Sequence, residues 1–331
     1  MIEFEILARG LYRPNQLKIT YNPTLKMPTT GITPDANMTS DKIIGSSVGA
    51  DLSRPSPIYR PSGESPIPPQ FDDIHHSAPT IQQWMDTLWQ QKLTIAQQKN
   101  IPLYDTPLYR LIHVETRNNG KLHLILGNTT YKEYVTTREP TFAQNRPREE
   151  LSNPLAVCSV IETTDNYILL DKRQGVDVYA GRFHVIGGFF ERDLDTTATS
   201  DTSDTSDTSD TNPDPFAAIR REIREETGIQ SADIAEQHCL GVVYDLATPH
   251  AELCFLTRLN IPLREVHQRV PEENEIKQLL SLSITEDSLR DFILTNHGNI
   301  SATGEPNLLM YGALKFGESW FDQMMERLLQ T

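Results

Sequence analysis

The apolar residues of the chain recur with the periods of strands and helices, most clearly in its second half. The strand-like runs are residues 155–163, 167–172, 240–246 and 252–259, and the runs with helical spacing are residues 284–295 and 316–329. Asp165-Asn166 provides a turn between the first two of these strands. Strands and helices arranged around a mixed sheet predict an α/β sandwich.

The pattern divides the chain into four regions. Residues 1–22 alternate between apolar and polar as two strands, with a hairpin as one arrangement. Residues 23–78 are rich in Pro, Ser and Asp without any period, which is typical of a linker or a loose loop. We expect residues 79–150 to form an α+β accessory region and residues 151–331 to form the main domain.

The accessory region begins with a helix that has one apolar face. The residues on this face are Ile81, Trp84, Met85, Leu88, Trp89 and Ile95. Thr80 can cap the helix, and the tryptophan-rich face predicts core packing rather than a cofactor site. Residues 108–117 and 121–127 then form a predicted hairpin, because Asn118-Asn119-Gly120 is a hairpin turn signal.

Charge and composition exclude several classes of function. The chain has 331 residues with 30 Lys and Arg against 45 Asp and Glu, a formal net charge of −15. A nucleic-acid-binding surface needs basic patches, so we expect none. No apolar run is long enough to cross a membrane, and the N-terminal residues lack the pattern of a signal peptide. Cys158, Cys239 and Cys254 lie in apolar contexts and predict reduced core residues of a cytoplasmic protein.

The segment from Arg221 to Ile229 carries the strongest chemical signal. It places Glu222, Glu225 and Glu226 at positions i, i+3 and i+4, on one face of a predicted helix that Gly228 would end. Three carboxylates on one face repel each other unless a hard divalent cation with oxygen ligands lies between them. The alternative is an ordinary surface helix in which Arg221 and Glu225 form an i,i+4 pair.

A pair of glycines lies upstream of this helix. Gly187-Gly188 follows a strand-like run at residues 183–186, and Glu191 comes three positions later. Two glycines between a strand and a helix predict a tight turn with exposed backbone amides that suits oxyanions.

An insertion separates the glycines from the helix. Within residues 195–213, Asp-Thr-Ser repeats from Asp201 onward without any residue that a core could bury, which predicts a disordered tether. Ordered structure resumes where Asp214 can cap the helix and Pro215 can take its first position.

These residues resemble the motif of the Nudix hydrolase family. The motif is Gly, five residues, Glu, seven residues, and then Arg-Glu-apolar-any-Glu-Glu-any-Gly-apolar. Gly188 matches its first glycine, and the residues from Arg221 to Ile229 match its second half without a departure. The middle Glu is missing: Leu194 occupies its place counted from Gly188, and Pro213 occupies it counted back from Arg221. The loop that this Glu would support is therefore expected to be less rigid.

Segments outside the motif resemble one branch of the family, the UDP-sugar diphosphatases. The segments that carry this resemblance are residues 89–93, 103–111, 126–131 and the pair Pro154-Leu155. The resemblance implies an α/β/α sandwich with an N-terminal accessory region. It also implies hydrolysis of UDP-glucose or UDP-galactose to UMP and a sugar 1-phosphate.

The family resemblance also assigns roles to the site residues. Mg²⁺, with Mn²⁺ as an alternative, would be held by Glu222, Glu225 and Glu226 against the two phosphates. Arg221 would orient these acids, and Gly187 and Gly188 would shape the loop. Two other functions stay open: hydrolysis of another linked nucleotide such as ADP-ribose, and binding of a nucleotide by a sensor that does not cleave it. The partner is a small-molecule nucleotide in each case, and the oligomeric state is left open.

Further residues are weaker candidates for the same site. The acids that could serve as general base are Glu252, Glu272, Glu273 and Glu275, with Glu252 preferred because it lies in the strand after the helix. The residues that could contact phosphate or base are Lys172, Arg173, Arg182, Tyr179 and Phe183. The alternative for each of these is a solvated charge or a core ring. His184 and His250 are expected to be packed rather than metal-bound, because an all-oxygen site does not need them.

Overall fold

The computed structural model of the protein describes residues 1–29, 80–117, 120–144, 146–173, 178–198, 211–272 and 279–330. Most of the predicted linker, residues 199–210 with the Asp-Thr-Ser repeat from Asp201, and the candidate acids Glu273 and Glu275 lie outside these residues.

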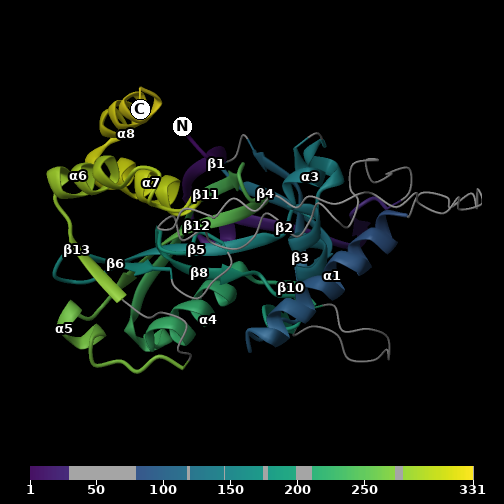
Figure 1. The fold of residues 1–331 in the computed structure, drawn as a ribbon. Helices are drawn as coiled ribbons and strands as arrows, with labels where there is room; N and C mark the ends of the chain where they lie inside the picture. Colours follow the sequence, from purple (N-terminus) through teal and green to yellow (C-terminus); the bar gives the residue numbers. More distant parts are fainter. Residues whose placement is uncertain are drawn as a thin grey trace, which may run out of the picture.

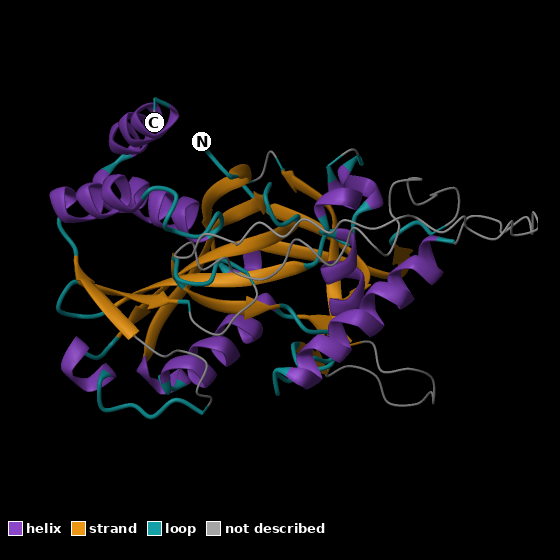
Figure 2. Ribbon diagram, in the orientation of Figure 1, coloured by secondary structure: helices purple, strands orange, loops and turns teal. Residues whose placement is uncertain are grey.

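A mixed eight-stranded sheet forms the centre of the molecule (Figure 2). Its main path runs through β1 (Phe4–Tyr12), β11 (Ile234–Asp245), β12 (His250–Leu259), β5 (Leu155–Glu162), β6 (Tyr167–Lys172) and β13 (Leu279–Ser283). Off this path, β8 (Ile186–Phe189) pairs with β5, and β7 (Phe183–His184) pairs with β6. The β12–β5 pair is parallel and the other pairs are antiparallel.

Helices cover both faces of this sheet, as Figure 1 shows. On one face, α4 (Pro215–Thr227) packs Phe216, Ile219 and Ile223 into the core, and α5 (Leu263–Val266) adds Val266. The other face is covered by α6 (Glu286–Asn296), α7 (Gly304–Phe316) and α8 (Glu318–Leu329). The predicted α/β sandwich with a mixed sheet is therefore confirmed.

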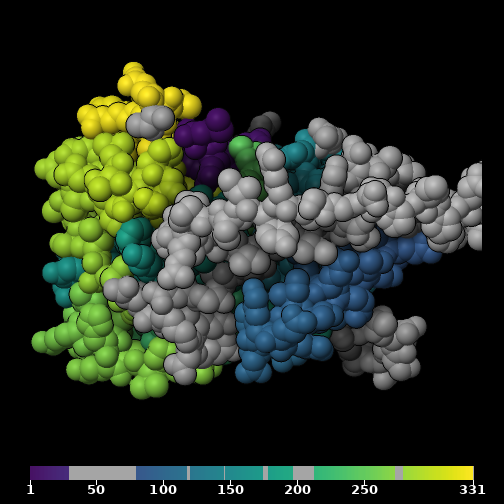
Figure 3. Space-filling view, in the orientation of Figure 1, coloured from purple at the N-terminus to yellow at the C-terminus, as the bar shows by residue number. Residues whose placement is uncertain are grey.

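The accessory region builds a second, three-stranded sheet. The strand order is β2 (Leu17–Lys26), β4 (Leu122–Thr130) and β3 (Pro107–Thr116), followed in the chain by the short helices α2 (Tyr131–Thr137) and α3 (Pro140–Ala143). The predicted hairpin is confirmed, because β3 and β4 pair antiparallel. The long helix α1 (Ile81–Gln98) forms much of the molecular surface on this side (Figure 3).

The predicted cap and apolar face of α1 are confirmed with one exception. The Thr80 side chain accepts a hydrogen bond from the Gln83 amide (3.3 Å). Ile95, however, is 47% exposed, and the neighbouring Ala96 is buried instead. The helical period places Ile95 on the same face, seven positions after Leu88, so its exposure shows that the clusters which cover Trp84 and Leu88 do not extend over Ile95.

The N-terminal strands do not pair with each other, so the hairpin arrangement is wrong. β1 pairs antiparallel with β11 in the central sheet, whereas β2 pairs parallel with β4 in the small sheet. The predicted boundary at residue 22 is also wrong, because β2 continues to Lys26. Alternation of polar and apolar residues identifies a strand but not its partner, and here each strand finds a partner more than a hundred residues away.

The helix α7 has no counterpart among the predicted elements. Its first ten residues, 304–313, are all buried, so its sequence lacks the one-sided apolar period by which surface helices are identified. Its first residues, Gly304-Glu305-Pro306-Asn307, also have the composition of a loop.

Two further observations concern helices that could cross a membrane and the three cysteines. In the described ranges, no helix combines the length and the apolar character that crossing a membrane requires. Cys158, Cys239 and Cys254 are free and buried, as predicted.

Candidate functional site

The acid-bearing helix α4 is fixed at both ends by the residues that predict its limits. Asp214 accepts hydrogen bonds from the amides of Phe216 (2.9 Å) and Ala217 (3.0 Å), and Pro215 occupies the first helical position. Gly228 ends the helix with φ 75°, a left-handed conformation that favours glycine. The predicted limits of the helix are therefore confirmed.

Gly187 and Gly188 form part of strand β8 rather than a turn, so the predicted oxyanion turn is wrong. They pair with Cys158 and Val157 of β5. A Cβ atom at Gly187 would lie 2.1 Å from the carbonyl oxygen of Val157, and one at Gly188 would lie 2.6 Å from the Glu222 carboxylate. Both glycines are needed because neighbouring groups approach the backbone closely, not because the chain turns there.

The backbone amide of Gly187 in β8 faces an acidic side chain and not an open position that an oxyanion could occupy. The Gly187 amide donates to Oε2 of Glu226 at 3.3 Å. Glu222 points into the same region from one turn earlier and has only 8% of its surface exposed. The strand therefore brings two of the three predicted ligands together.

Arg221 lies at the centre of the acidic side chains. Its guanidinium is 2.9 Å from Oε1 of Glu222 and 2.9 Å from Oε2 of Glu225, and it donates to the carbonyl of Phe189 at 3.1 Å. Burial opposes its charge, but Asp195 and Glu222 outweigh burial and raise the pKa of Arg221 well above its usual range. The predicted orienting role of Arg221 agrees with these contacts.

Asp195 lies among the acidic side chains around Arg221, although its sequence context predicts that it belongs to the insertion. It is 1% exposed and forms two parallel hydrogen bonds of 2.8 Å with Arg221. It also accepts from the amide of Glu191 at 2.9 Å. It comes one residue after Leu194, which occupies the place of the middle Glu in the motif that the sequence resembles. Leu194 itself is exposed.

The carboxylates shift each other's pKa values. Burial raises the pKa of Glu222 to about 8, and the charges of Glu225, Asp195 and Glu191 add to this against the opposing charge of Arg221. Burial likewise raises the pKa of Glu191. Clusters of perturbed carboxyl groups are typical of functional sites.

The three helix acids have the donor chemistry for a hard cation but are not arranged around one point. In the part of the chain that the structure describes, no three His, Cys, Asp or Glu side chains are placed to hold a metal ion together. Arg221 lies between Glu222 and Glu225. Metal binding therefore requires these carboxylates to turn away from the guanidinium.

Glu252, the preferred general base, is not brought to this site. In the unbroken β12–β5 register, Glu252 alternates with Leu253, whose side chain lies in the core on the α4 face. Glu252 faces the α7 side, 3.7 Å from His184 and 3.9 Å from His250. Burial acts to raise its pKa, but the two histidines outweigh burial and lower the pKa to about 2. Glu272 is exposed and pairs with Arg224.

The basic candidates at the strand ends have partners within the chain. The Lys172 ammonium lies 5.5 Å from the centre of the Phe183 ring, and the Arg173 guanidinium donates to the carbonyl of Val178. Phe183 packs edge-on against Phe292 and partly enters the core. These contacts favour the structural interpretation of all three residues.

Arg182 and Tyr179 belong to a second polar network. Arg182 forms an ion pair with Glu3 and lies over the Tyr179 ring, 4.4 Å from its centre. The Tyr179 hydroxyl donates to both oxygens of the buried Asp245, at 2.9 and 2.8 Å. This network ties β1 to the end of β11 and involves none of the acids of α4.

The ends of the insertion are ordered, so the predicted boundaries of 195–213 are wrong. Thr196–Ala198 (β9) and Thr211–Pro213 (β10) pair antiparallel, with Ala198 opposite Thr211. The residues that flank the segment 199–210 therefore lie side by side, and Asp195 precedes this ribbon.

Removing residues 199–210 and joining Ala198 to Thr211 through Asn-Gly should leave kcat/KM within about twofold. A two-residue turn of this type closes such a ribbon. A longer excision, of residues 195–212, should lower stability because it also removes the partner of Arg221. Steady-state kinetics and thermal unfolding of both deletions test this, and equal losses in the two would contradict it.

Comparison with known proteins gives only weak similarity. No family model matches the chain, and no curated protein matches it. A bifunctional NMN adenylyltransferase/ADP ribose pyrophosphatase from Francisella tularensis, complexed with AMP and a manganese ion, is 15% identical with a TM-score of 0.32, and the match covers 50% of this chain and 42% of that one. The NUDIX domain of Shewanella oneidensis NrtR, complexed with ADP ribose, is 14% identical with a TM-score of 0.33, covering 57% and 99%. A MutT protein from Methanosarcina mazei is 17% identical with a TM-score of 0.31, covering 52% and 96%.

At these identities and TM-scores the matches carry no argument about activity or substrate. Any assignment of function therefore depends on the residues of the site itself.

Proposed function

We propose that the chain is a Nudix hydrolase that cleaves a diphosphate linkage in a nucleoside diphosphate derivative with the help of a divalent cation. The observation that carries this proposal is the set of carboxylates around Arg221. Asp195, Glu222 and Glu225 contact its guanidinium, the Glu191 carboxylate interacts with its charge, and Glu226 lies beside this group on the Gly187 amide. The largely buried Arg221 and the more exposed Arg224, which pairs with Glu225, do not balance this charge, and a hard cation would.

The residues present have the donor chemistry for such a cation, which would bind once the carboxylates of Glu222 and Glu225 turn away from Arg221. Glu222, Glu225 and Glu226 offer oxygen donors from two successive turns of one helix, and Gly188, which lacks a side chain, leaves room for the carboxylate of Glu222. When bound, the cation supplies positive charge against the diphosphate oxygens.

The remaining residues of the site hold these acids in place. Asp195 and the Phe189 carbonyl fix the guanidinium of Arg221, which in turn orients Glu222 and Glu225. The Gly187 amide holds Glu226 from the strand. Pre-positioned groups of this kind lower the cost of organising the transition state.

We further propose UDP-sugars as the substrates, with UMP and a sugar 1-phosphate as products. The support is the resemblance of residues 89–93, 103–111 and 126–131 to the UDP-sugar diphosphatase branch. A second support is that Leu108, within one of these segments, forms a short antiparallel bridge with Glu191 of the acidic site.

Product analysis after incubation with a panel of nucleotide sugars and dinucleotides, with Mg²⁺ and with a chelator, tests the proposal. We expect UMP and a sugar 1-phosphate only with metal, and no product from Glu225→Gln. Glu326→Gln, an exposed glutamate on α8, is the matched control and should keep full activity. Cleavage of ADP-ribose alone would overturn the substrate but keep the reaction. Binding of a nucleotide without any cleavage would identify a sensor instead.

A further inference from the structure

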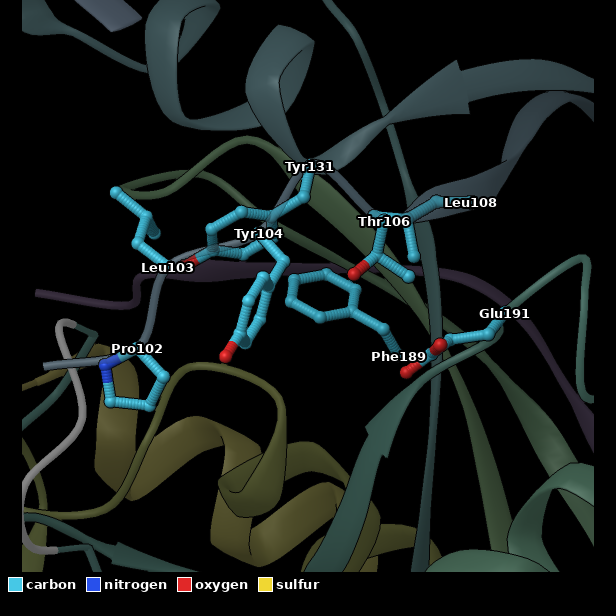
Figure 4. Close-up of a pocket in the computed structure, with 8 residues that line it drawn as sticks. All are labelled: Pro102, Leu103, Tyr104, Thr106, Leu108, Tyr131, Phe189 and Glu191. Atoms are coloured by element: carbon cyan, nitrogen blue, oxygen red, sulfur yellow. The ribbon is translucent and has the colours of Figure 1, made fainter. Parts of the chain in front are cut away.

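A pocket opens directly beside the acidic site, between the accessory region and the central sheet (Figure 4). It has a volume of about 210 Å³, and Pro102, Leu103 and Tyr104 line it from the accessory side. Tyr131 from the start of α2 and Phe189 from the end of β8 complete its aromatic wall. Figure 4 shows the rings of Tyr104, Tyr131 and Phe189 gathered around it, with the Glu191 carboxylate at one side.

Two of the three rings are held by the core behind them. Tyr134 is buried and packs edge-on against Phe189 (5.4 Å between ring centres) and Tyr131 (6.1 Å). Tyr131 and Phe189 also contact each other edge-on at 5.7 Å. Tyr104, in contrast, is 74% exposed. The pocket therefore has a fixed aromatic wall and a third ring whose surface is available to a ligand.

The wall of the pocket is continuous with the acidic site. Phe189 places its ring in the pocket while its carbonyl accepts from Arg221 at 3.1 Å. Glu191 lines the pocket while its amide donates to Asp195. A molecule whose phosphates meet the acids of α4 through a cation would thus extend its other end toward these rings.

The charge of the lining selects which part of a nucleotide fits here. No lysine, arginine or histidine is among the lining residues, and the one charged group is the Glu191 carboxylate. Such a lining disfavours a phosphate and favours a neutral aromatic ring with N–H donors. Base-on-aromatic stacking is tolerant of the kind of base, because every base has a π face.

We propose that this pocket binds the nucleobase of the substrate and that Tyr104 is its stacking residue. The inference rests on the proposed function, because it assigns a subsite to the same nucleotide. It also gives the accessory region a direct part in substrate recognition.

Replacing Tyr104 by Ala should weaken nucleotide binding by about tenfold or more, the typical effect of removing one stacked ring. Equilibrium dialysis of UMP, CMP, AMP and GMP, each with Mg²⁺ and with chelator, measures this, with ribose 5-phosphate as the ligand without a base. Tyr104→Phe keeps the ring and should bind within about twofold of the parent. Ile95→Ala truncates an exposed apolar side chain elsewhere in the accessory region and should change nothing.

The outcomes separate this inference from the proposed function. Weaker binding of a monophosphate to Tyr104→Ala, with ribose 5-phosphate unaffected, supports the pocket even in a protein that hydrolyses nothing. Unchanged binding, or a failure of the parent to prefer any monophosphate over ribose 5-phosphate, overturns it even in an active hydrolase. In an active parent, Tyr104→Ala should raise KM about tenfold while kcat stays within about twofold. A loss confined to kcat would contradict a binding role.

Discussion

Replacing Glu222 by Gln should abolish turnover and at the same time stabilise the metal-free protein at neutral and alkaline pH. The loss of a ligand should lower kcat by about a hundredfold or more. The gain in stability follows from the burial of the carboxyl group, which raises its pKa to about 8 in the folded state. Ionisation of Glu222 therefore costs free energy only in the folded protein.

The sign of the pH dependence is defined by these pKa values. Well below pH 4.5 the carboxyl is neutral in both states, so the parent and Glu222→Gln should unfold alike. As pH rises toward 8, the parent loses stability relative to the variant, by on the order of 2–4 kcal/mol. Urea unfolding at several pH values with chelator measures this difference. If the difference in unfolding midpoint between the parent and Glu222→Gln were the same at pH 5 and at pH 8, Glu222 would not be buried as described.

A divalent cation should reverse the loss of stability that the parent shows as pH rises, and it should not stabilise Glu222→Gln in this way. Binding to the folded state stabilises it, and it does so through the ionised carboxylate that the variant lacks. The same unfolding experiment with Mg²⁺ in place of chelator tests the point. Glu326→Gln serves again as the exposed control and should follow the parent throughout.

Replacing Asp195 by Asn should destabilise the protein by about 3 kcal/mol and lower kcat by about ten- to a hundredfold. The change leaves the largely buried guanidinium of Arg221 without its bidentate partner, so both Arg221 and the acids that it orients lose their fixed positions. Thermal and urea unfolding measure the first effect, and steady-state kinetics measure the second.

The matched control for this prediction is Asp193→Asn, an exposed aspartate in the same loop. It removes the same charge near the site but no contact of Arg221, and it should leave both quantities nearly unchanged. Similar losses in the two variants would point to loop charge rather than to the Asp195–Arg221 pair.

Local signals predicted the parts of the site that depend on neighbours in sequence. The N-cap at Asp214, the proline at the first helical position and the left-handed Gly228 depend only on the chemistry of a few adjacent residues. The shared face of Glu222, Glu225 and Glu226 likewise follows from the helical period alone.

The parts that could not be predicted depend on contacts across the fold. A pair of glycines in a sequence is compatible with a turn and with a strand. Only the close approach of β5 and Glu222 to Gly187 and Gly188 shows that here they belong to a strand. Asp195 is one aspartate among many in its segment, and the sequence does not distinguish it from the others. Its ion pair with Arg221 depends on the fold, in which β9 pairs with β10 directly after Asp195. The aromatic pocket combines residues from two sheets, which no spacing rule can bring together.

The pairing of β1 with β11 has a consequence for the order in which the molecule acquires its structure. Phe4 is opposite Asp245, so β1 is synthesised long before β11, the strand with which its backbone groups pair. Contacts of such high sequence separation fold slowly and leave strand edges open to other chains in the meantime. We expect newly made protein to depend on chaperones until β11 emerges, and fragments that end before residue 234 to aggregate.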